Sequence, residues 1–151
     1  MPVRTASAKW DGNLREGAGS MSLGSGAFDG QYSFSSRFEE GTGTNPEELI
    51  GAANAGCFSM FLANLLAQAG HAPRSIATTA RVHLDQVDGG FEITRIELAS
   101  EGEVEDVEED EFRRHAQAAK EGCPVSKALT GVDISLDAQL VAESAGAASE
   151  S

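Results

Sequence analysis

Two cysteines are the residues of this 151-residue chain that could carry redox chemistry. Cys57 stands inside the apolar run "ELIGAANAGCFSMFLANLLAQAG", and Cys123 stands in "GCPVSKAL". A thiol reacts as its thiolate, and a nearby positive charge or a helix N-terminus lowers its pKa. We expect Cys123 to begin a short helix directly before Pro124, where backbone N–H groups favour a thiolate. Cys57 has apolar neighbours, and burial alone raises the pKa of a thiol, so Cys57 needs a cation brought by the fold.

Arg37 is the candidate for that cation. It lies in "QYSFSSRF", whose alternation predicts a strand with the aromatic residues on one face and Arg37 among serines on the other. A guanidinium keeps its charge when it is buried, and it then needs a carboxylate partner. Of the two acids that follow in "NPEEL", Glu48 is explained by helix capping, which leaves Glu47 as the freer partner.

The spacing between Glu47 and Cys57 restricts how one site could contain both residues. On one straight helix they would lie about 15 Å apart along the axis and point about 80° apart. Either Arg37 spans the gap, or the helix breaks near Gly51, or the acid comes from the antiparallel helix of a second subunit. The small residues of "GAANAG" would let two helix backbones approach closely, which agrees with the third arrangement.

The helix that must position Cys57 has clear boundaries in the sequence. Asn45 is a good N-cap, Pro46 suits the first helical position, and Gly70 is a good C-cap, so we expect a helix to about Ala69. Apolar residues occupy nearly every face over residues 49–66. We therefore predict an enclosed helix whose burial takes more than one neighbour.

The remaining patterns predict an α+β fold. Turn signals and alternation give an antiparallel meander of about three strands that ends near Glu40, and two long strands joined at Asp88-Gly89-Gly90. A helix over about 108–121, a short helix to Leu129 and a final strand over 132–141 follow. We expect four residues of the long strands to face the core: Val82, Leu84, Phe91 and Ile93.

Composition favours one globular domain over residues 1–141 and a disordered tail over 142–151. The chain has 40% hydrophobic and 23% charged residues, which is ordinary globular usage. Its net charge of −13 repels nucleic acid and anionic membranes, so neither is an expected partner. Asn54, Ser59 and Asn64 interrupt the apolar helix, which argues against a membrane span.

The expected location is the cytoplasm, because "MPVRTASAKW" lacks the apolar core of a signal peptide. Two cysteines there are expected to be thiols rather than a structural disulfide. The three histidines, His71, His83 and His115, are dispersed without metal-ligand spacing, and no glycine-rich phosphate loop follows a strand. We predict neither a metal nor a cofactor.

Each candidate also has a purely structural interpretation. A free cysteine in an apolar helix often serves as a small hydrophobic residue, and a cysteine before a proline can be incidental. Arg37 could be a solvated residue on a strand face, and Glu47 could complement the helix dipole. Composition and spacing leave these alternatives open.

The run "SSRFEEGTGTNPEELIGAANAGCFSMFLANLLAQAG", followed by "GCPVSKAL", resembles the OsmC branch of the OsmC/Ohr family of organic hydroperoxide peroxidases. The likeness extends from about Lys9 to Leu140. It implies an OsmC-like α+β fold, with antiparallel sheets around a long buried central helix, in an intertwined homodimer with sites at the subunit interface.

The resemblance also implies a role for each candidate. Cys57 matches the cysteine that attacks the peroxide, Cys123 the resolving cysteine, Arg37 the activating arginine, and Glu47 the acid that holds the arginine. The match of Arg37 to the activating arginine depends most on which branch of the family the chain resembles, because the OsmC and Ohr branches take this arginine from different strands. Three apolar residues near the thiol are then expected to bind the organic part of the substrate: Phe58, Met60 and Phe61.

The implied function is the reduction of organic hydroperoxides, and less readily of hydrogen peroxide, in oxidative and osmotic stress defence. The expected reductant is a dithiol, such as a lipoylated protein. Two alternatives share the fold: a non-enzymatic protein that binds a small apolar ligand, and a redox sensor whose Cys57–Cys123 disulfide changes a partner surface.

Overall fold

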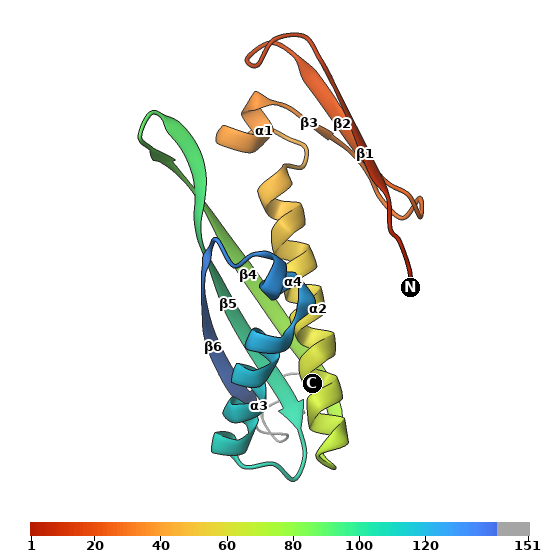
Figure 1. Cartoon of the computed structure of the whole chain (residues 1–151), viewed down its shortest axis with the longest axis vertical. Helices are drawn as coiled ribbons and strands as arrows, with labels where there is room; N and C mark the ends of the chain where they lie inside the picture. The colour runs from red at the N-terminus through yellow and green to blue at the C-terminus, as the bar shows by residue number, and fades with distance from the viewer. Residues whose placement is uncertain (142–151) are drawn as a thin grey trace, which may run out of the picture. The chain divides into compact units, whose positions relative to one another are not determined.

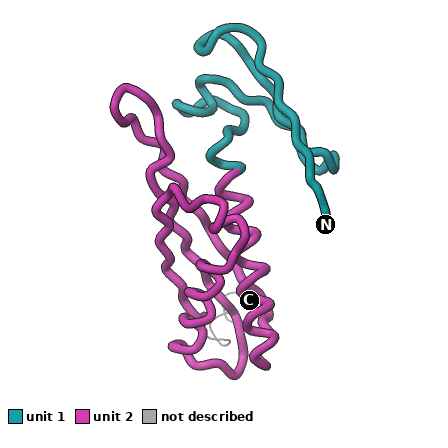
Figure 2. Tube along the Cα trace, viewed as in Figure 1, with its two compact units in different colours: residues 1–49 teal, residues 50–151 magenta. Residues whose placement is uncertain are grey.

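The computed structural model describes residues 1–141. Internal contacts divide the chain into two compact units, residues 1–49 and residues 50–151, which Figure 2 shows in teal and magenta. The expected tail over residues 142–151 lies outside the described residues. The prediction of a single domain over residues 1–141 stays a prediction.

The first unit contains a three-stranded antiparallel meander, as predicted. Its strands are β1 (Ala6–Asp11), β2 (Ala18–Leu23) and β3 (Asp29–Tyr32), in the order β1-β2-β3. Gly19 of β2 pairs with Trp10 on one side and Tyr32 on the other, and these two rings are tilted against each other with centroids 5.3 Å apart. A Cβ atom at Gly19 would meet those rings at 2.6 and 2.7 Å, so this position requires glycine.

The strand expected through "QYSFSSRF" ends early, and that part of the prediction is wrong. After β3 the chain turns into a short helix, α1 (Phe34–Phe38), so Arg37 lies in a helix and not on a strand face. The reason is a reciprocal cap. The Ser33 hydroxyl accepts from the Ser36 backbone N–H at 3.1 Å, and the Ser36 hydroxyl accepts from the Ser33 N–H at 2.8 Å.

Helix α2 (Pro46–Gln68) begins where the sequence predicts. The Asn45 side-chain oxygen accepts from the Glu48 backbone N–H at 2.7 Å, which caps the first turn. The Glu48 carboxylate accepts from the Thr44 hydroxyl at 2.8 Å instead of completing a capping box with Asn45. Gly70 follows the helix with a φ of +91°, the left-handed conformation expected of a C-cap glycine.

Within the single chain, α2 buries one stripe and is not enclosed. Its buried residues recur at helical spacing: Glu47, Gly51, Asn54, Phe58, Leu62 and Leu66. Other apolar residues of α2 are open, and Met60 has 77% of its surface exposed. Helix α2 is long and apolar enough to cross a membrane by length and composition, a test that core helices of soluble proteins also pass. The prediction of an enclosed helix is therefore not met by one chain alone.

The second unit is built on a three-stranded sheet of order β4-β5-β6. Strands β4 (Pro73–Val87) and β5 (Gly90–Val104) form the predicted hairpin, and β6 (Asp133–Val141) runs parallel to β5. Parallel neighbours need a crossover connection. Figure 1 shows that helices α3 (Glu109–Gly122) and α4 (Pro124–Ala128) make this crossover.

The core of the second unit joins α2, α3 and the sheet. Its buried side chains come from α2, β5, α3 and β6: Phe58, Leu62, Leu66, Ile96, Leu98, Val104, Phe112, Ala116, Ala119 and Ala138. Val82 packs against this cluster as predicted. Phe91, next to the hairpin turn, has 55% of its surface exposed, so the prediction that it faces the core is wrong.

Candidate functional site

Cys57 lies near the middle of α2 and is half-buried. It stands next to the buried stripe of the helix, whose members Asn54 and Phe58 have no exposed surface. Its sulfur is therefore anchored by a packed helix while part of the residue stays open to solvent.

Cys123 lies in the crossover, at the junction of α3 and α4, and has no exposed surface. Its backbone N–H donates to the Ala119 carbonyl at 2.9 Å, and its carbonyl accepts from the Lys127 N–H at 3.0 Å. It thus ends α3 and begins α4 directly before Pro124, as the sequence predicts.

The two thiols lie close enough that each shifts the pKa of the other. Burial, followed by the contact with Cys123, raises the pKa of Cys57. Burial also acts to raise the pKa of Cys123, but the influence of Cys57, Ser126 and Val125 outweighs it and lowers that pKa. Residues far apart in the sequence are thus brought into contact, with the first negative charge of the pair favoured on Cys123.

Arg37 and Glu47 form the ion pair that the sequence suggested. The Arg37 guanidinium donates from Nε at 3.1 Å and from Nη2 at 2.8 Å to the two carboxylate oxygens of Glu47. The Glu47 side chain is 8% exposed and the Arg37 side chain 36% exposed. A bidentate contact of this kind fixes the plane of the guanidinium while leaving part of it open.

The ion pair belongs to the first compact unit and the thiol pair to the second. Burial within the second unit raises the pKa of Cys57, as the sequence predicts for a thiol that has no cation nearby. The role of Arg37 at Cys57 therefore stays a prediction.

The three residues expected to bind substrate have different environments. Phe58 is fully buried in the core, and Met60 is exposed. Phe61 is half-buried and packs against the core. A Cβ atom on Gly122 would meet the Phe61 ring at 2.9 Å, so Phe61 lies against the residue before Cys123. Their contact with a substrate stays a prediction, and Phe58 has no free surface for one in the single chain.

A hollow of about 210 Å³ beside Arg37 was missed by the sequence argument. Its lining is mainly aromatic: Trp10, Leu14, Tyr32, Ser33, Phe34, Arg37 and Phe38. The Arg37 guanidinium carbon lies 5.3 Å from the centre of the Phe38 ring, and the Phe34 and Phe38 rings are 5.0 Å apart. The aromatic spacing in "YSFSSRF" was the available signal, and it was interpreted as a strand face.

Two histidines that look dispersed in the sequence meet in the structure. His71 and His115 each place Nε2 near the same oxygen of Glu111, at 3.0 and 3.4 Å. Hydrogen bonds from His115 first, and then from His71, lower the pKa of Glu111. Within residues 1–141 no group of three or more His, Cys, Asp and Glu could hold a metal ion.

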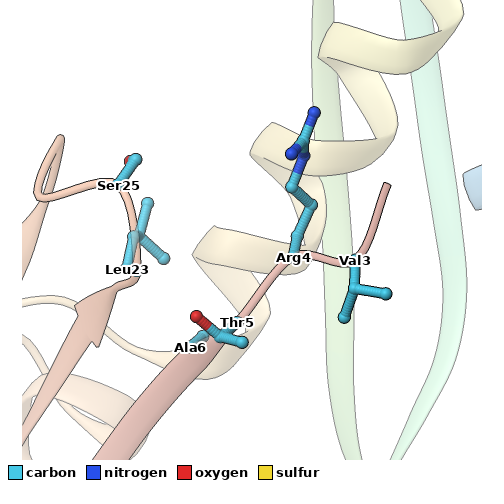
Figure 3. Close-up of a pocket in the computed structure, with 7 residues that line it drawn as sticks. Val3, Arg4, Thr5, Ala6, Leu23 and Ser25 are labelled. Atoms are coloured by element: carbon cyan, nitrogen blue, oxygen red, sulfur yellow. The ribbon is translucent and has the colours of Figure 1, made fainter. Parts of the chain in front are cut away.

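A larger hollow of about 670 Å³ lies in the first unit and carries little chemistry. Figure 3 shows its lining, which combines the N-terminal segment with the end of β2. Arg4 is the single charged residue among the lining residues, and no thiol or carboxylate faces it. This hollow offers no group for redox work.

The fold and the thiols define a class: an α+β protein with two neighbouring free cysteines, one half-buried on a long helix and one buried in a crossover connection. Residues 39–137 match the model of the family described as OsmC-like protein, and the chain belongs to this family. Glu47 and both cysteines lie inside the matched residues, whereas Arg37 lies just before them.

Individual relatives agree with the family. The chain is 52% identical to Peroxiredoxin OsmC of Escherichia coli over 134 residues, which cover 88% of this chain and 93% of that protein. It is 31% identical over 123 residues to the organic hydroperoxide resistance protein OhrB of Bacillus subtilis, covering 80% of this chain and 88% of that protein. The crystal structure of that OhrB superposes with a TM-score of 0.70, at 28% identity, over 89% of this chain and 97% of the other.

Proposed function

We propose that this protein is a thiol peroxidase that reduces organic hydroperoxides to alcohols, with Cys57 as the nucleophile and Cys123 as the resolving thiol. One observation carries the proposal: the two free cysteines, far apart in the sequence, are brought close enough for each to shift the pKa of the other. Relatives named for peroxiredoxin activity and for organic hydroperoxide resistance support the same chemistry.

The proposed cycle has three steps. The Cys57 thiolate attacks one peroxide oxygen, the O–O bond breaks, and an alcohol leaves while Cys57 becomes a sulfenic acid. The Cys123 sulfur then attacks the Cys57 sulfur, and a disulfide forms with loss of water. A dithiol reductant restores both thiols by exchange. Without the second step, excess peroxide would oxidise Cys57 to acids that do not revert.

The exposures of the two thiols support this assignment of roles. Cys57 is half-buried, so a hydroperoxide can approach its sulfur, whereas Cys123 has no exposed surface. A buried thiol that lies near the nucleophile suits internal attack on a sulfenic acid. The reverse assignment would ask the substrate to reach a sulfur without an opening.

Arg37 is the cation that we assign to the activation of Cys57. A fixed positive charge near a thiol lowers its pKa, which offsets the increase caused by burial. The guanidinium can also donate to the peroxide oxygens as charge moves onto the leaving group. Its bidentate contact with buried Glu47 supports this role, because the contact holds the guanidinium in one orientation.

The aromatic hollow beside Arg37 supports a preference for organic hydroperoxides. Its volume of about 210 Å³ is enough for a small aryl or alkyl group, and its walls are mainly aromatic rings. Transfer of apolar surface from water onto such walls is favourable. Hydrogen peroxide has no apolar surface to transfer, so it gains nothing from them.

The assembly that we propose is a homodimer in the cytoplasm. Apolar surface on α2 that one chain leaves open, including Met60 at 77% exposure, supports a second copy as the cover. The reducing compartment supplies the dithiol, for which a lipoylated protein is our candidate.

Thiol titration tests the peroxidase proposal. Free thiols of the reduced chain are counted before and after one equivalent of cumene hydroperoxide. We expect two thiols to become none, with one equivalent of cumyl alcohol released and no cross-linked dimer on a non-reducing gel. Cys57→Ser should release no alcohol above the buffer rate, whereas Cys123→Ser should release one equivalent and retain a sulfenic acid.

Other outcomes favour the rival functions. If the reduced chain keeps both thiols and releases no alcohol, the peroxidase proposal is wrong, and a protein that binds a small apolar ligand becomes the better interpretation. If the disulfide forms but dithiols reduce it too slowly for repeated turnover, a redox sensor would be the better interpretation.

A further inference from the structure

A buried hydrogen bond joins the middle of α2 to the crossover connection. Asn54 of α2 has no exposed surface, and Ser126 of α4 is 8% exposed. The Asn54 amide Nδ2 donates to the Ser126 hydroxyl oxygen at 3.0 Å, across 72 positions of sequence. The Asn54 amide oxygen has no partner among the described residues. A buried amide that is only half satisfied weakens folding, so this contact needs an explanation other than stability.

A close approach of ring to backbone joins the same two segments further along α2. A Cβ atom on Gly122 would meet the Phe61 ring at 2.9 and 3.0 Å. Gly122 is the last residue of α3 and has no positive φ, so its backbone conformation does not require glycine. Alanine is the more favourable residue in a helix. The feature that accounts for glycine here is the contact with Phe61.

These two contacts lie on either side of the cysteines. Cys57 stands three residues after Asn54 and four residues before Phe61, so the three side chains leave α2 within about 60° of one another. Along the crossover, Cys123 lies between the two residues that make the contacts. Helix geometry and two contacts therefore place the thiols opposite each other, in agreement with the influence of each on the pKa of the other.

We propose that a two-point clamp positions the resolving step: the hydrogen bond between Asn54 and Ser126, and the close approach at Gly122, hold the two sulfurs within reach of each other. This inference rests on the proposed function. The hydrogen bond sets the distance between α2 and α4, and the glycine lets α2 approach the end of α3. An intramolecular step is fast when the reacting atoms are held in place before the reaction.

The step that the clamp assists is balanced in atoms and electrons. The Cys123 thiolate forms the S–S bond to the Cys57 sulfur, and the Cys57 S–O bond breaks. The departing hydroxide takes up the proton that Cys123 released, which gives water. The Cys57 sulfur is reduced and the Cys123 sulfur is oxidised, so the step needs no further oxidant or reductant.

The test is a single-turnover experiment on the full-length reduced protein. Cumene hydroperoxide is mixed with it in a stopped-flow instrument, and dimedone competes with Cys123 for the Cys57 sulfenic acid. We expect Asn54→Leu and Ser126→Ala each to slow disulfide formation, relative to peroxide consumption, by about tenfold or more. The reason is that a small misplacement of the reacting groups strongly slows an intramolecular step.

Two comparisons distinguish the clamp from a general loss of stability. Ser59→Ala removes another hydrogen bond of α2, to the Thr78 hydroxyl of β4 at 2.7 Å, and should leave the rate unchanged. The double variant Asn54→Leu, Ser126→Ala should be no slower than the slower single variant, because both changes remove the same contact. Thermal unfolding of each variant verifies that it is folded. Wild-type rates in both single variants, an equal effect of Ser59→Ala, or effects of the two changes that multiply would each overturn the inference.

Gly122→Ala tests the second point of the clamp. Alanine suits the end of α3, but its Cβ atom must displace the Phe61 ring or the crossover. We expect slower disulfide formation in a protein that remains folded. A wild-type rate of disulfide formation in this variant would overturn the second point.

A redox titration keeps the inference separate from the peroxidase proposal. The clamp raises the effective concentration of one thiol at the other, so Asn54→Leu should raise the reduction potential of the Cys57–Cys123 disulfide by about 30 mV for each tenfold loss in the equilibrium constant. Asn54 is the better position for this measurement, because Ser126 also influences the pKa of Cys123. The titration uses glutathione buffers and no peroxide. An unchanged potential contradicts the clamp, whereas a raised potential in a protein without peroxidase activity contradicts only the proposed function.

Discussion

The ion pair of Arg37 and Glu47 predicts an asymmetry between two single substitutions. Glu47 is the more buried partner, with 8% of its side chain exposed against 36% for Arg37. Removing one partner of a fully buried pair costs about 3–5 kcal/mol, because the other charge is left without compensation. Arg37→Met leaves a buried carboxylate, and partial access of water reduces that cost to about 2 kcal/mol. Glu47→Gln leaves a guanidinium that can hydrate, and it should cost about 1 kcal/mol or less.

Urea unfolding at one fixed protein concentration measures both changes, with equal slopes required before midpoints are compared. The double variant Arg37→Met, Glu47→Gln should be more stable than the sum of the single losses predicts, since it leaves no unpaired buried charge. If Glu47→Gln lowers the free energy of unfolding more than Arg37→Met does, or if the two losses simply add, then Arg37 and Glu47 do not form the buried ion pair described above.

The same arginine variant tests the activation of Cys57. Without the guanidinium, burial and the contact with Cys123 would leave the Cys57 pKa raised. The alkylation rate of Cys57 by iodoacetamide should then rise only at higher pH than in the wild type. Overlapping profiles would mean that another group activates the thiol.

Two further predictions concern binding and assembly. The chain has one tryptophan, Trp10, which lines the hollow beside Arg37, so cumyl alcohol should change its fluorescence. Leu14→Asp should weaken that binding about tenfold or more, because it places a charge on an apolar wall. Leu23→Asp, at another exposed leucine that lies outside this hollow, should not weaken it. Equal titrations in all three proteins would refute the assignment. Sedimentation of the wild type should give a dimer, and Met60→Lys should shift it towards monomer; a wild-type monomer at micromolar concentration would contradict the homodimer.

Local signals in the sequence predicted the elements that are stabilised locally. The Asn45 cap, Pro46 and the turn at Asp88-Gly89 gave the start of α2 and the hairpin. The helix α1 was missed because alternating aromatic and polar residues favour a strand, and the pair of serines that caps it, Ser33 and Ser36, lacks the acid of the usual signature.

The long-range contacts of the site could be predicted only in part. Contact of the thiols followed from the resemblance and not from spacing. Asn54 was noted only as an interruption of an apolar helix, and its contact with Ser126 depends on how the crossover packs. The exposure of apolar residues on α2 could not be predicted either. The sequence shows which residues are apolar, but it does not show whether the same chain or a second one covers them.

The crossover that carries Cys123 is held at both ends, by β5 and by β6, which pair along a parallel ladder from Arg95↔Asp133 to Glu103↔Val141. A sulfur mounted on so constrained a segment can bond to a neighbour it already touches without dragging the surrounding backbone. Oxidised and reduced forms would then present nearly the same exterior to other molecules. Such an arrangement suits a catalyst that must cycle repeatedly. It suits a redox sensor less well, because a partner protein would meet almost the same surface in both states.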